Sequence, residues 1–96
     1  MIKLKMDKKN IINKRTIKLM TTSSCHLCDE AFQMFHYLLN TKPVFAKQFE
    51  LQLIEIANDD HMIERYGIRI PVLKLNNNEL GWIFTINELS AWLESL

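Results

Sequence analysis

The stretch Thr21–Glu30 reads TTSSCHLCDE and contains two cysteines, Cys25 and Cys28, three positions apart. The residues just before it, Thr16–Thr21, form a short apolar-rich segment that is typical of a β-strand. The residues after it predict a helix from Cys25 to about Asn40, because apolar side chains recur there at helical spacing. We therefore expect the Cys-x-x-Cys pair to lie where a strand passes through a short loop into the start of a helix.

The middle of the chain predicts a second strand and a short helix. Pro43 breaks the first helix. The segment Glu50–Ile56 is rich in Leu and Ile, which favours a strand buried on both faces. Residues 58–60 (Asn-Asp-Asp) supply N-cap candidates for a helix through Tyr66, and Gly67 suits the C′ position of that helix.

The end of the chain predicts a hairpin and a last helix. Val72–Leu75 and Glu79–Phe84 have strand character and are joined by an asparagine-rich turn. Thr85 and Glu88 have the spacing of a capping box for a final amphipathic helix. The predicted order is β-α-β-α-β-β-α, an α/β chain with parallel β-α-β units and a late antiparallel edge. This order is that of the thioredoxin-like fold, a central mixed sheet flanked by helices.

Composition divides the chain into a basic head and an acidic body. Residues 1–15 carry six basic side chains and one acidic side chain, whereas residues 16–96 carry six basic and ten acidic groups. We expect residues 1–15 to be a flexible extension and residues 16–96 to be one domain. The head lacks an aromatic side chain that could stack on a base, so nucleic acid is not an expected partner.

No secretory signal and no apolar run long enough to span a bilayer is found in the sequence. We therefore expect a cytoplasmic monomer that does not act at a membrane. In that reducing compartment, two cysteines so close together favour catalysis or metal binding over a structural disulfide. A zinc site needs about four ligands, and neither a second Cys-x-x-Cys nor a spaced His pair is present, so no metal is expected.

The position of the two cysteines at a helix start assigns them different roles. Amide groups and the dipole at a helix N-terminus stabilise an anion, which lowers the pKa of a thiol placed there. We expect Cys25 to be the exposed nucleophile and Cys28, one turn later, to be the buried resolving thiol. His26 either favours the Cys25 thiolate or points into solvent, and both interpretations stay open here. Asp29 and Glu30 oppose an adjacent thiolate.

Three segments together are similar to the glutaredoxin-like domain family, small thioredoxin-fold proteins with a Cys-x-Leu-Cys motif. These segments are Thr21–Glu30, Arg65–Leu73 (RYGIRIPVL) and Leu89–Leu93 (LSAWL), and the resemblance covers about residues 16–96. It implies thiol–disulfide chemistry. It also implies that Ile70–Pro71 matches the cis-proline of the fold, beside the active disulfide, although X-Pro bonds are cis in only about 5–6% of cases.

The chain departs from better-known members of the fold at several positions. Glutaredoxins usually carry Cys-Pro-Tyr-Cys and a Gly-Gly-x-Asp region that holds glutathione, but His26 and Leu27 stand between the cysteines here and the Gly-Gly pair is absent. Ser24 stands where thioredoxin has a tryptophan before its first cysteine. We expect glutathione to be at best a weak ligand, with Lys18, Lys42 and Arg69 as the cationic side chains that could contact it.

The expected function is therefore a thiol–disulfide oxidoreductase that needs no bound cofactor. Its substrate would be a protein or peptide disulfide, and a cellular thiol would regenerate it. The resemblance implies that a substrate chain pairs with the backbone of Ile70, and that Ser24, His26, Leu27 and Pro71 border the groove. The alternatives are a binding module with redox-silent or regulatory cysteines, a glutathione-dependent glutaredoxin that uses glutathione as co-substrate, and an iron–sulfur or zinc carrier in which two chains share Cys25.

Overall fold

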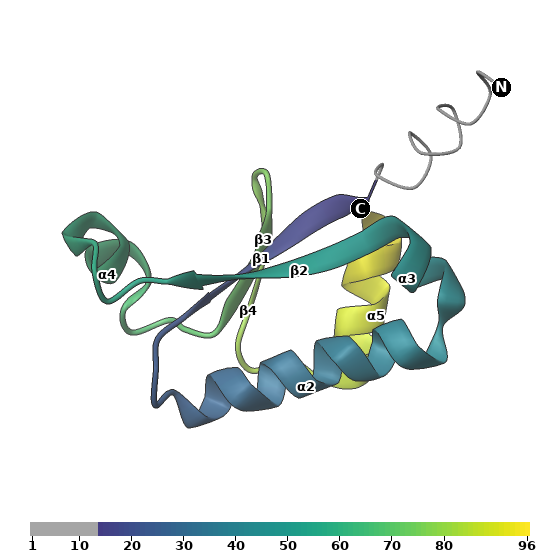
Figure 1. Cartoon of the computed structure of the whole chain (residues 1–96), viewed down its shortest axis with the longest axis horizontal. Helices are drawn as coiled ribbons and strands as arrows, with labels where there is room; N and C mark the ends of the chain where they lie inside the picture. Colours follow the sequence, from purple (N-terminus) through teal and green to yellow (C-terminus); the bar gives the residue numbers. More distant parts are fainter. Residues whose placement is uncertain (1–13) are drawn as a thin grey trace, which may run out of the picture.

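The computed structural model, which describes residues 14–96, has a four-stranded mixed sheet in the order β2-β1-β3-β4 (Figure 1). The strands are β1 (Arg15–Thr21), β2 (Phe49–Glu55), β3 (Val72–Leu75) and β4 (Asn78–Gly81). The helices are α2 (His26–Thr41), α3 (Pro43–Gln48), α4 (Asp60–Tyr66) and α5 (Ile86–Ser95). Strand β2 runs parallel to β1, whereas β3 is antiparallel to both β1 and β4. The predicted thioredoxin-like topology is confirmed.

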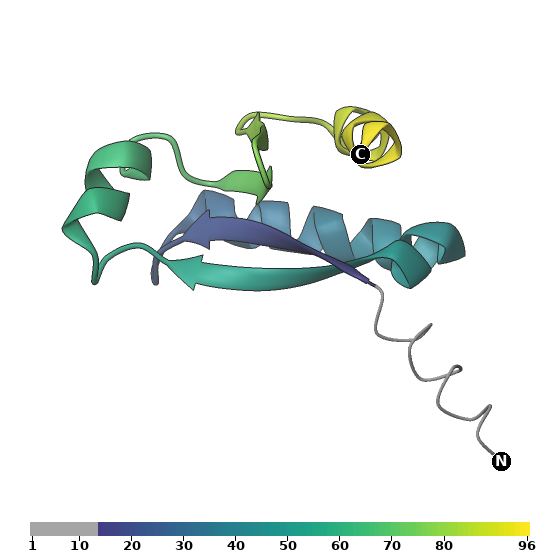
Figure 2. The ribbon, with the colours of Figure 1, turned by 90° about the horizontal axis from the view of Figure 1, so that it is seen from above.

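The helices α2 and α5 lie on the same face of the sheet, and α4 lies beyond the carboxyl ends of β1 and β2 (Figures 1 and 2). The main core fills the space between the sheet and the α2–α5 layer. Ile17 and Leu19 of β1 point into it, and Phe35 of α2 is fully buried there. Burial of these alternate β1 residues against one stripe of α2 fixes the strand register and the direction of the helix.

A second, smaller core lies on the opposite face, at the end of the sheet where the Cys-x-x-Cys loop begins. Met20 and Val72, which are paired in neighbouring strands, pack there with Ile56 and with Tyr66 of α4. The loop that leads into α2 is thus held from both sides, since Met20 is anchored on one face of the sheet and Ala31 of α2 packs in the main core on the other.

The prediction that the second strand is buried on both faces is wrong. β2 is an edge strand whose burial alternates irregularly, and Leu53 is 53% exposed although it points toward the α2 side. Glu50 and Gln52 point to the opposite face and are exposed. The apolar composition of β2 is that of a covered strand, but hydrophobicity alone does not report that this strand lies at the edge of the sheet.

Capping residues begin two helices where the sequence predicted. Asp59 caps α4 by accepting hydrogen bonds from the N–H groups of His61 and Met62, and Thr85 and Glu88 form a reciprocal capping box on α5. Gly67 follows α4 as expected but keeps a right-handed helical backbone (φ −48°). A Cβ at Gly67 would approach the carbonyl oxygen of Ile63 to 2.5 Å, so the glycine permits a close approach and not a left-handed turn.

The first strand begins at Arg15, one residue before the segment Thr16–Thr21 that the sequence predicts as a strand. Arg15 is the first residue of β1, and its guanidinium donates a hydrogen bond to the backbone oxygen of Leu96 (2.8 Å). Residues 1–13 of the expected extension lie outside the described residues. Within residues 14–96, no helix has both the length and the apolar character needed to cross a membrane.

Candidate active site

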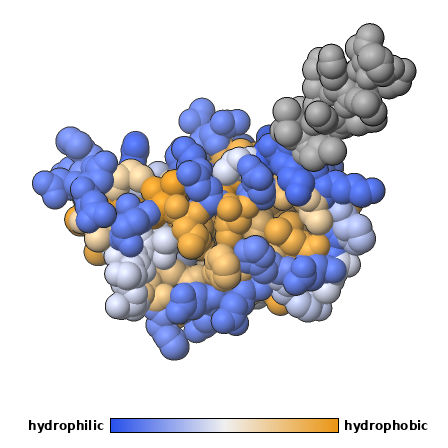
Figure 3. All heavy atoms as spheres, viewed as in Figure 1, coloured by the Kyte–Doolittle hydropathy of each residue, from blue (hydrophilic) through white to orange (hydrophobic). Residues whose placement is uncertain are grey.

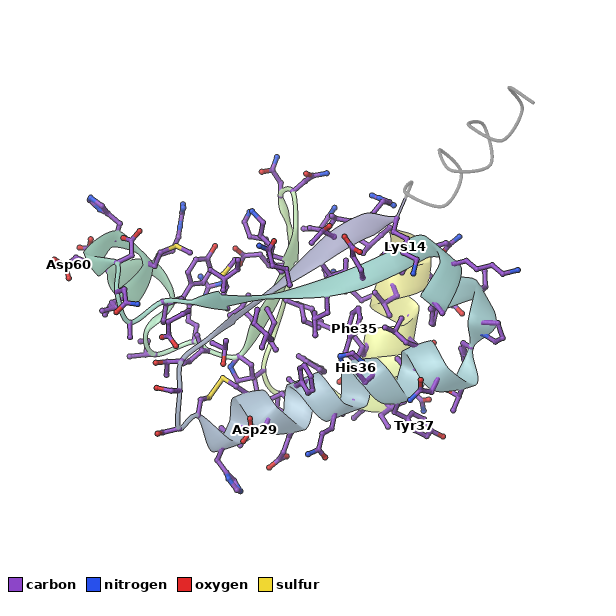
Figure 4. All side chains as sticks on the ribbon, viewed as in Figure 1. Lys14, Asp29, Phe35, His36, Tyr37 and Asp60 are labelled. Atoms are coloured by element: carbon purple, nitrogen blue, oxygen red, sulfur yellow. A yellow bond between two sulfur atoms is a disulfide. The ribbon has the colours of Figure 1, made fainter. Side chains whose placement is uncertain are left out.

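Cys25 is the N-cap residue of α2 and forms a disulfide with Cys28, visible as the yellow bond at the start of the helix in Figure 4. The two Cα atoms are 5.2 Å apart, which is an ordinary separation for a disulfide. The N–H group of Cys28 donates a hydrogen bond to the Sγ atom of Cys25 (3.1 Å). The sulfur of Cys25 therefore occupies the position at which a capping side chain accepts from the free amides of the first helical turn.

The two cysteines differ in exposure in the way that their one-turn offset predicts. Cys28 is 3% exposed, whereas Cys25 is half-buried. Ser24, immediately before Cys25, has a left-handed backbone (φ 71°), which is uncommon for a residue other than glycine. This turn brings the chain from the end of β1 to the cap of α2 within three residues, so Ser24 positions the first cysteine through its backbone.

The Ile70–Pro71 peptide bond is cis, as the family resemblance implied. Pro71 is fully buried and comes directly before Val72, which pairs with Met20 near the end of β1. The sheet register thus places Pro71 at the same end of the sheet as the cysteine loop, on the β3 side. The N–H group of Trp82 donates to the carbonyl oxygen of Pro71 (3.1 Å), which holds the segment after β4 at this end of the sheet. Close packing of Pro71 on the sulfurs stays a prediction.

A cluster of polar side chains holds the loop that leads into Pro71. The hydroxyl of buried Tyr66 donates to the carboxylate of Glu79 on β4 (3.3 Å), and the same carboxylate forms an ion pair with Arg69. The guanidinium of Arg69 also lies over the ring of Tyr66, 5.2 Å from its centroid. Burial, followed by the negative charge of Glu79, raises the pKa of Tyr66, so its hydroxyl keeps its proton and remains a donor.

A second carboxylate holds the loop on the β2 side. Glu55, the last residue of β2, accepts hydrogen bonds from the N–H groups of Ala57 (2.8 Å) and Ser23 (3.1 Å). The hydrogen bond from Ala57 is the largest cause that lowers the pKa of Glu55, and hydrogen bonds from Thr22 and Ser23 add to it. Glu55 therefore stays ionised at neutral pH and links the loop before Cys25 to the turn after β2.

The side chains between the cysteines point outward. His26 is exposed, and no side-chain hydrogen bond to its ring is found in the described part of the chain, which favours the solvent-facing interpretation. Leu27 is 43% exposed. Among residues 14–96 no group of three or more His, Cys, Asp or Glu side chains is arranged to hold a metal ion.

The three cations that were expected to contact glutathione are not gathered at the disulfide. Lys42 follows the last turn of α2, about 25 Å along the helix axis from Cys25, and its ammonium group donates to the hydroxyl of Ser90 (3.0 Å). Arg69 is engaged by Glu79. Lys18 alternates with Ile17 and Leu19, which face the main core, and so it points to the opposite face of the sheet.

Sequence reasoning missed the two carboxylates that hold the loops. Glu55 and Glu79 lie at or near strand ends and have no motif spacing relative to the cysteines. The signal that could have identified Glu55 is its position at the carboxyl end of a predicted parallel strand, beside the loop that follows the neighbouring strand.

The fold and the capped Cys-x-x-Cys pair define a thioredoxin-like protein with a disulfide at the start of its first described helix. The model of the glutaredoxin-like domain (DUF836) matches residues 16–94, and the chain belongs to this family. No curated protein matches the sequence.

Two solved structures of another protein are similar to this chain. The crystal structure of Northeast Structural Genomics target protein XcR50 from X. campestris is 28% identical to this chain with a TM-score of 0.70, and the match covers 83% of this chain and 97% of that one. Its solution structure is also 28% identical, with a TM-score of 0.69, and the match covers 83% of this chain and 94% of that one. A structure described as a malarial protein shares the fold, at 13% identity and a TM-score of 0.59, over 86% of this chain and 97% of the other.

Proposed function

We propose that this protein is a thiol–disulfide oxidoreductase that acts on disulfides of other proteins or peptides. The observation that carries the proposal is the Cys25–Cys28 pair at a helix N-terminus, with the first sulfur partly exposed in the capping position and the second buried. An exposed thiolate that can attack and a neighbouring thiol that can resolve are the two parts that disulfide exchange needs.

The reaction begins from the reduced protein. The thiolate of Cys25 attacks one sulfur of the substrate disulfide, and the other substrate sulfur leaves as a thiolate that takes up a proton. The thiolate of Cys28 then attacks the Sγ atom of Cys25, which releases the second substrate thiol and leaves the Cys25–Cys28 disulfide. Two electrons have passed to the substrate, and a cellular dithiol or two monothiols return them in a further exchange.

Exposed apolar side chains around the disulfide favour a polypeptide substrate. Leu27 lies between the cysteines, and Ile83, which follows the segment tied to Pro71, is 78% exposed. The backbone of Ile70, just before Pro71, is the expected pairing position for an extended substrate chain through its carbonyl oxygen, since its N–H group donates to the carbonyl oxygen of Tyr66 (3.0 Å). Of the three cationic candidates, Lys42 and Arg69 are engaged elsewhere and Lys18 faces away, which disfavours a dedicated glutathione site.

Within this proposal Ser24 sets the position of Cys25, and His26, Leu27, Ile70 and Pro71 border the substrate groove. The protein would act as a monomer in the cytoplasm, where cellular thiols are available to regenerate the dithiol.

The test is a Cys28→Ser variant, which cannot resolve the mixed disulfide on Cys25. Expressed in cells and isolated under acid quench, it is expected to carry disulfide-linked proteins, and a matched Cys25→Ser variant is expected to carry none. Wild-type protein is expected to reduce insulin with a thiol reductant. Glutathione as the sole adduct would make the protein a glutaredoxin in function, and the absence of any adduct and any reductase activity would favour a binding module.

A further inference from the structure

Two adjoining cavities lie beside the disulfide on the β2 side, opposite the Pro71 side. Their volumes are about 150 and 350 Å³, and they share Thr21, Asp29 and Leu53 as lining residues. The smaller cavity reaches Cys28 and Phe32, and the larger one extends along the loop before Cys25 to Glu55. Together they form one groove that leads from the buried cysteine to the end of the edge strand, here called the β2-side groove.

The floor of the β2-side groove is apolar and open to solvent. Leu53 is 53% exposed and Phe32 is 38% exposed, and buried Leu19 lies beneath them. Figure 3 shows a continuous hydrophobic area between β2 and α2 on this side of the molecule. Phe32 lies one helical turn after Cys28, so a side chain that enters the smaller cavity would contact the same helical face that carries the resolving cysteine.

The rim of the β2-side groove is acidic. Asp29 and Glu55 both line it, whereas the residues that line the two cavities include no Lys, Arg or His. Hydrogen bonds hold the Glu55 carboxylate in its ionised form, as described above. The groove thus has an apolar floor and two carboxylates that are not paired with a cation among the lining residues. Such a surface is complementary to a large apolar side chain next to a basic one.

The groove can be reached by a substrate chain that is already bound at the disulfide. In the sheet order, β1 separates β3 from β2, so Ile70, in the loop just before β3, and the β2-side groove are about 10 Å apart across the sheet. An extended chain covers that distance with about three residues. A polypeptide paired with Ile70 and crossing the disulfide would therefore place a residue about three positions along in the groove.

We propose that the β2-side groove is a specificity subsite that binds a large apolar side chain adjacent to Lys or Arg in the substrate polypeptide. This inference rests on the proposed oxidoreductase function. It adds that the substrate is contacted on both sides of the Cys25–Cys28 loop, by Ile70 on one side and by Leu53, Phe32 and Asp29 on the other.

The experiment compares synthetic peptides that each contain one cysteine and are joined as symmetric disulfides. In the first pair, one peptide has Leu-Lys and the other has Ser-Glu, starting at the third position after the cysteine. In the second pair, the same two dipeptides stand at the corresponding positions before the cysteine. In one of the two pairs, reduced wild-type protein is expected to reduce the Leu-Lys peptide about tenfold faster than the Ser-Glu peptide. The difference comes from the partial burial of one leucine side chain and from one pair of opposite charges. The part due to lysine is expected to shrink at high salt.

Variants locate the preference in the β2-side groove. Leu53→Ser is expected to reduce the ratio of the two rates to about twofold, since a buried leucine contact supplies most of it. Asp29→Asn is expected to weaken the salt dependence of this ratio, because Glu55 keeps the other carboxylate of the rim. Gln52→Ser is the matched control, because Gln52 is exposed on the neighbouring position of β2 and points to the opposite face. Glu55 is left intact because its carboxylate holds the loop.

The outcomes separate the two proposals. If the wild type reduces both peptides at equal rates, or if Leu53→Ser keeps the full preference, the subsite is refuted and the oxidoreductase function stands. If the wild type reduces neither the peptides nor the small disulfide of hydroxyethanethiol, the proposed function itself is refuted, and the subsite with it. Because each variant is judged by a ratio of rates, a general loss of activity does not imitate the predicted effect.

Discussion

After reduction, Cys25 should react with a thiol-alkylating reagent well before Cys28. The perturbation is a pH series from 5 to 9 in which the reduced protein is exposed briefly to iodoacetamide. The physical reason lies in the cap of α2, where the N–H group of Cys28 points at the Sγ atom of Cys25 at 3.1 Å. A thiolate at that position gains a charge-assisted hydrogen bond and the field of the helix N-terminus, whereas the Cys28 thiol is almost inaccessible.

The expected magnitude follows from these contacts. A hydrogen bond to a charged group contributes about 1.5–3 kcal/mol, and the helix N-terminus about 0.3–1 kcal/mol. The neighbouring carboxylates Asp29 and Glu30 oppose part of this, which leaves about 2 kcal/mol and a roughly 30-fold larger thiolate population at pH 6. Nucleophilicity falls with basicity, with a Brønsted slope of about 0.4–0.5, so the net gain in rate is about fivefold over a free thiol. Burial slows the alkylation of Cys28, so the labelling rates of the two cysteines should differ by about tenfold or more.

The assay is tandem mass spectrometry of the tryptic peptide that contains both cysteines, whose fragments show which of them is labelled after each pulse. The label on Cys25 should appear first and should reach its plateau at a lower pH than free cysteine does. The Cys28→Ser variant is the control, because it reports the Cys25 profile without competition. Faster labelling of Cys28, or a Cys25 profile that coincides with that of free cysteine, would refute the reasoning from the helix cap.

Three further predictions concern stability. Phe35→Ala, at a fully buried core position, should lower the free energy of unfolding in urea by about 3–5 kcal/mol, and a loss under 1 kcal/mol would contradict the assigned core. Thr85→Ala removes half of the α5 capping box and should cost about 1 kcal/mol, or about 4–8 °C in melting temperature, whereas a variant melting like wild type would show that the cap is dispensable. Glu55→Gln removes a carboxylate whose pKa is lowered in the folded protein. The stabilisation that this carboxylate provides is present above pH 4.5, the ordinary pKa of Glu, and is lost as the pH falls through the lowered pKa. The wild type should therefore melt above this variant at pH 7 and lose that advantage on acidification, and an advantage that grows at acid pH would reverse the assigned sign.

Local signals predicted the elements correctly where the cause of the structure is itself local. The apolar stripe of α2 and the capping box at Thr85 each lie within one helix, so the residues that interact are neighbours in the sequence. The burial of β2 was predicted wrongly because it depends on which strands flank it. Its apolar residues suit a central strand, but Leu53 lies at an open edge of the sheet.

The candidate site likewise has features that local sequence signals predicted and features that they did not. The Cys25–Cys28 spacing and the helix that follows it predicted a redox-active pair at a helix start with the second cysteine more buried, but not that Cys25 itself is the N-cap residue. The cis form of the Ile70–Pro71 bond came only from the family resemblance, since local chemistry favours the trans form. The roles of Glu55 and Glu79 were not predicted, because Glu55 holds Ser23, which is 32 positions away, and Glu79 holds Tyr66, which is 13 positions away.

The sequence by itself determined the order of the elements and the chemistry available at the start of α2, because helix periodicity, capping residues and cysteine spacing act over a few neighbouring positions. Only the tertiary structure decided that β1 would lie between β2 and β3. This arrangement places the cysteine loop between Pro71, just before β3, on one side and the groove lined by Leu53 and Asp29 on the other. The physical reason is that strand order is set by burying the common apolar face under α2 and α5, a condition on the whole sheet that no single segment carries.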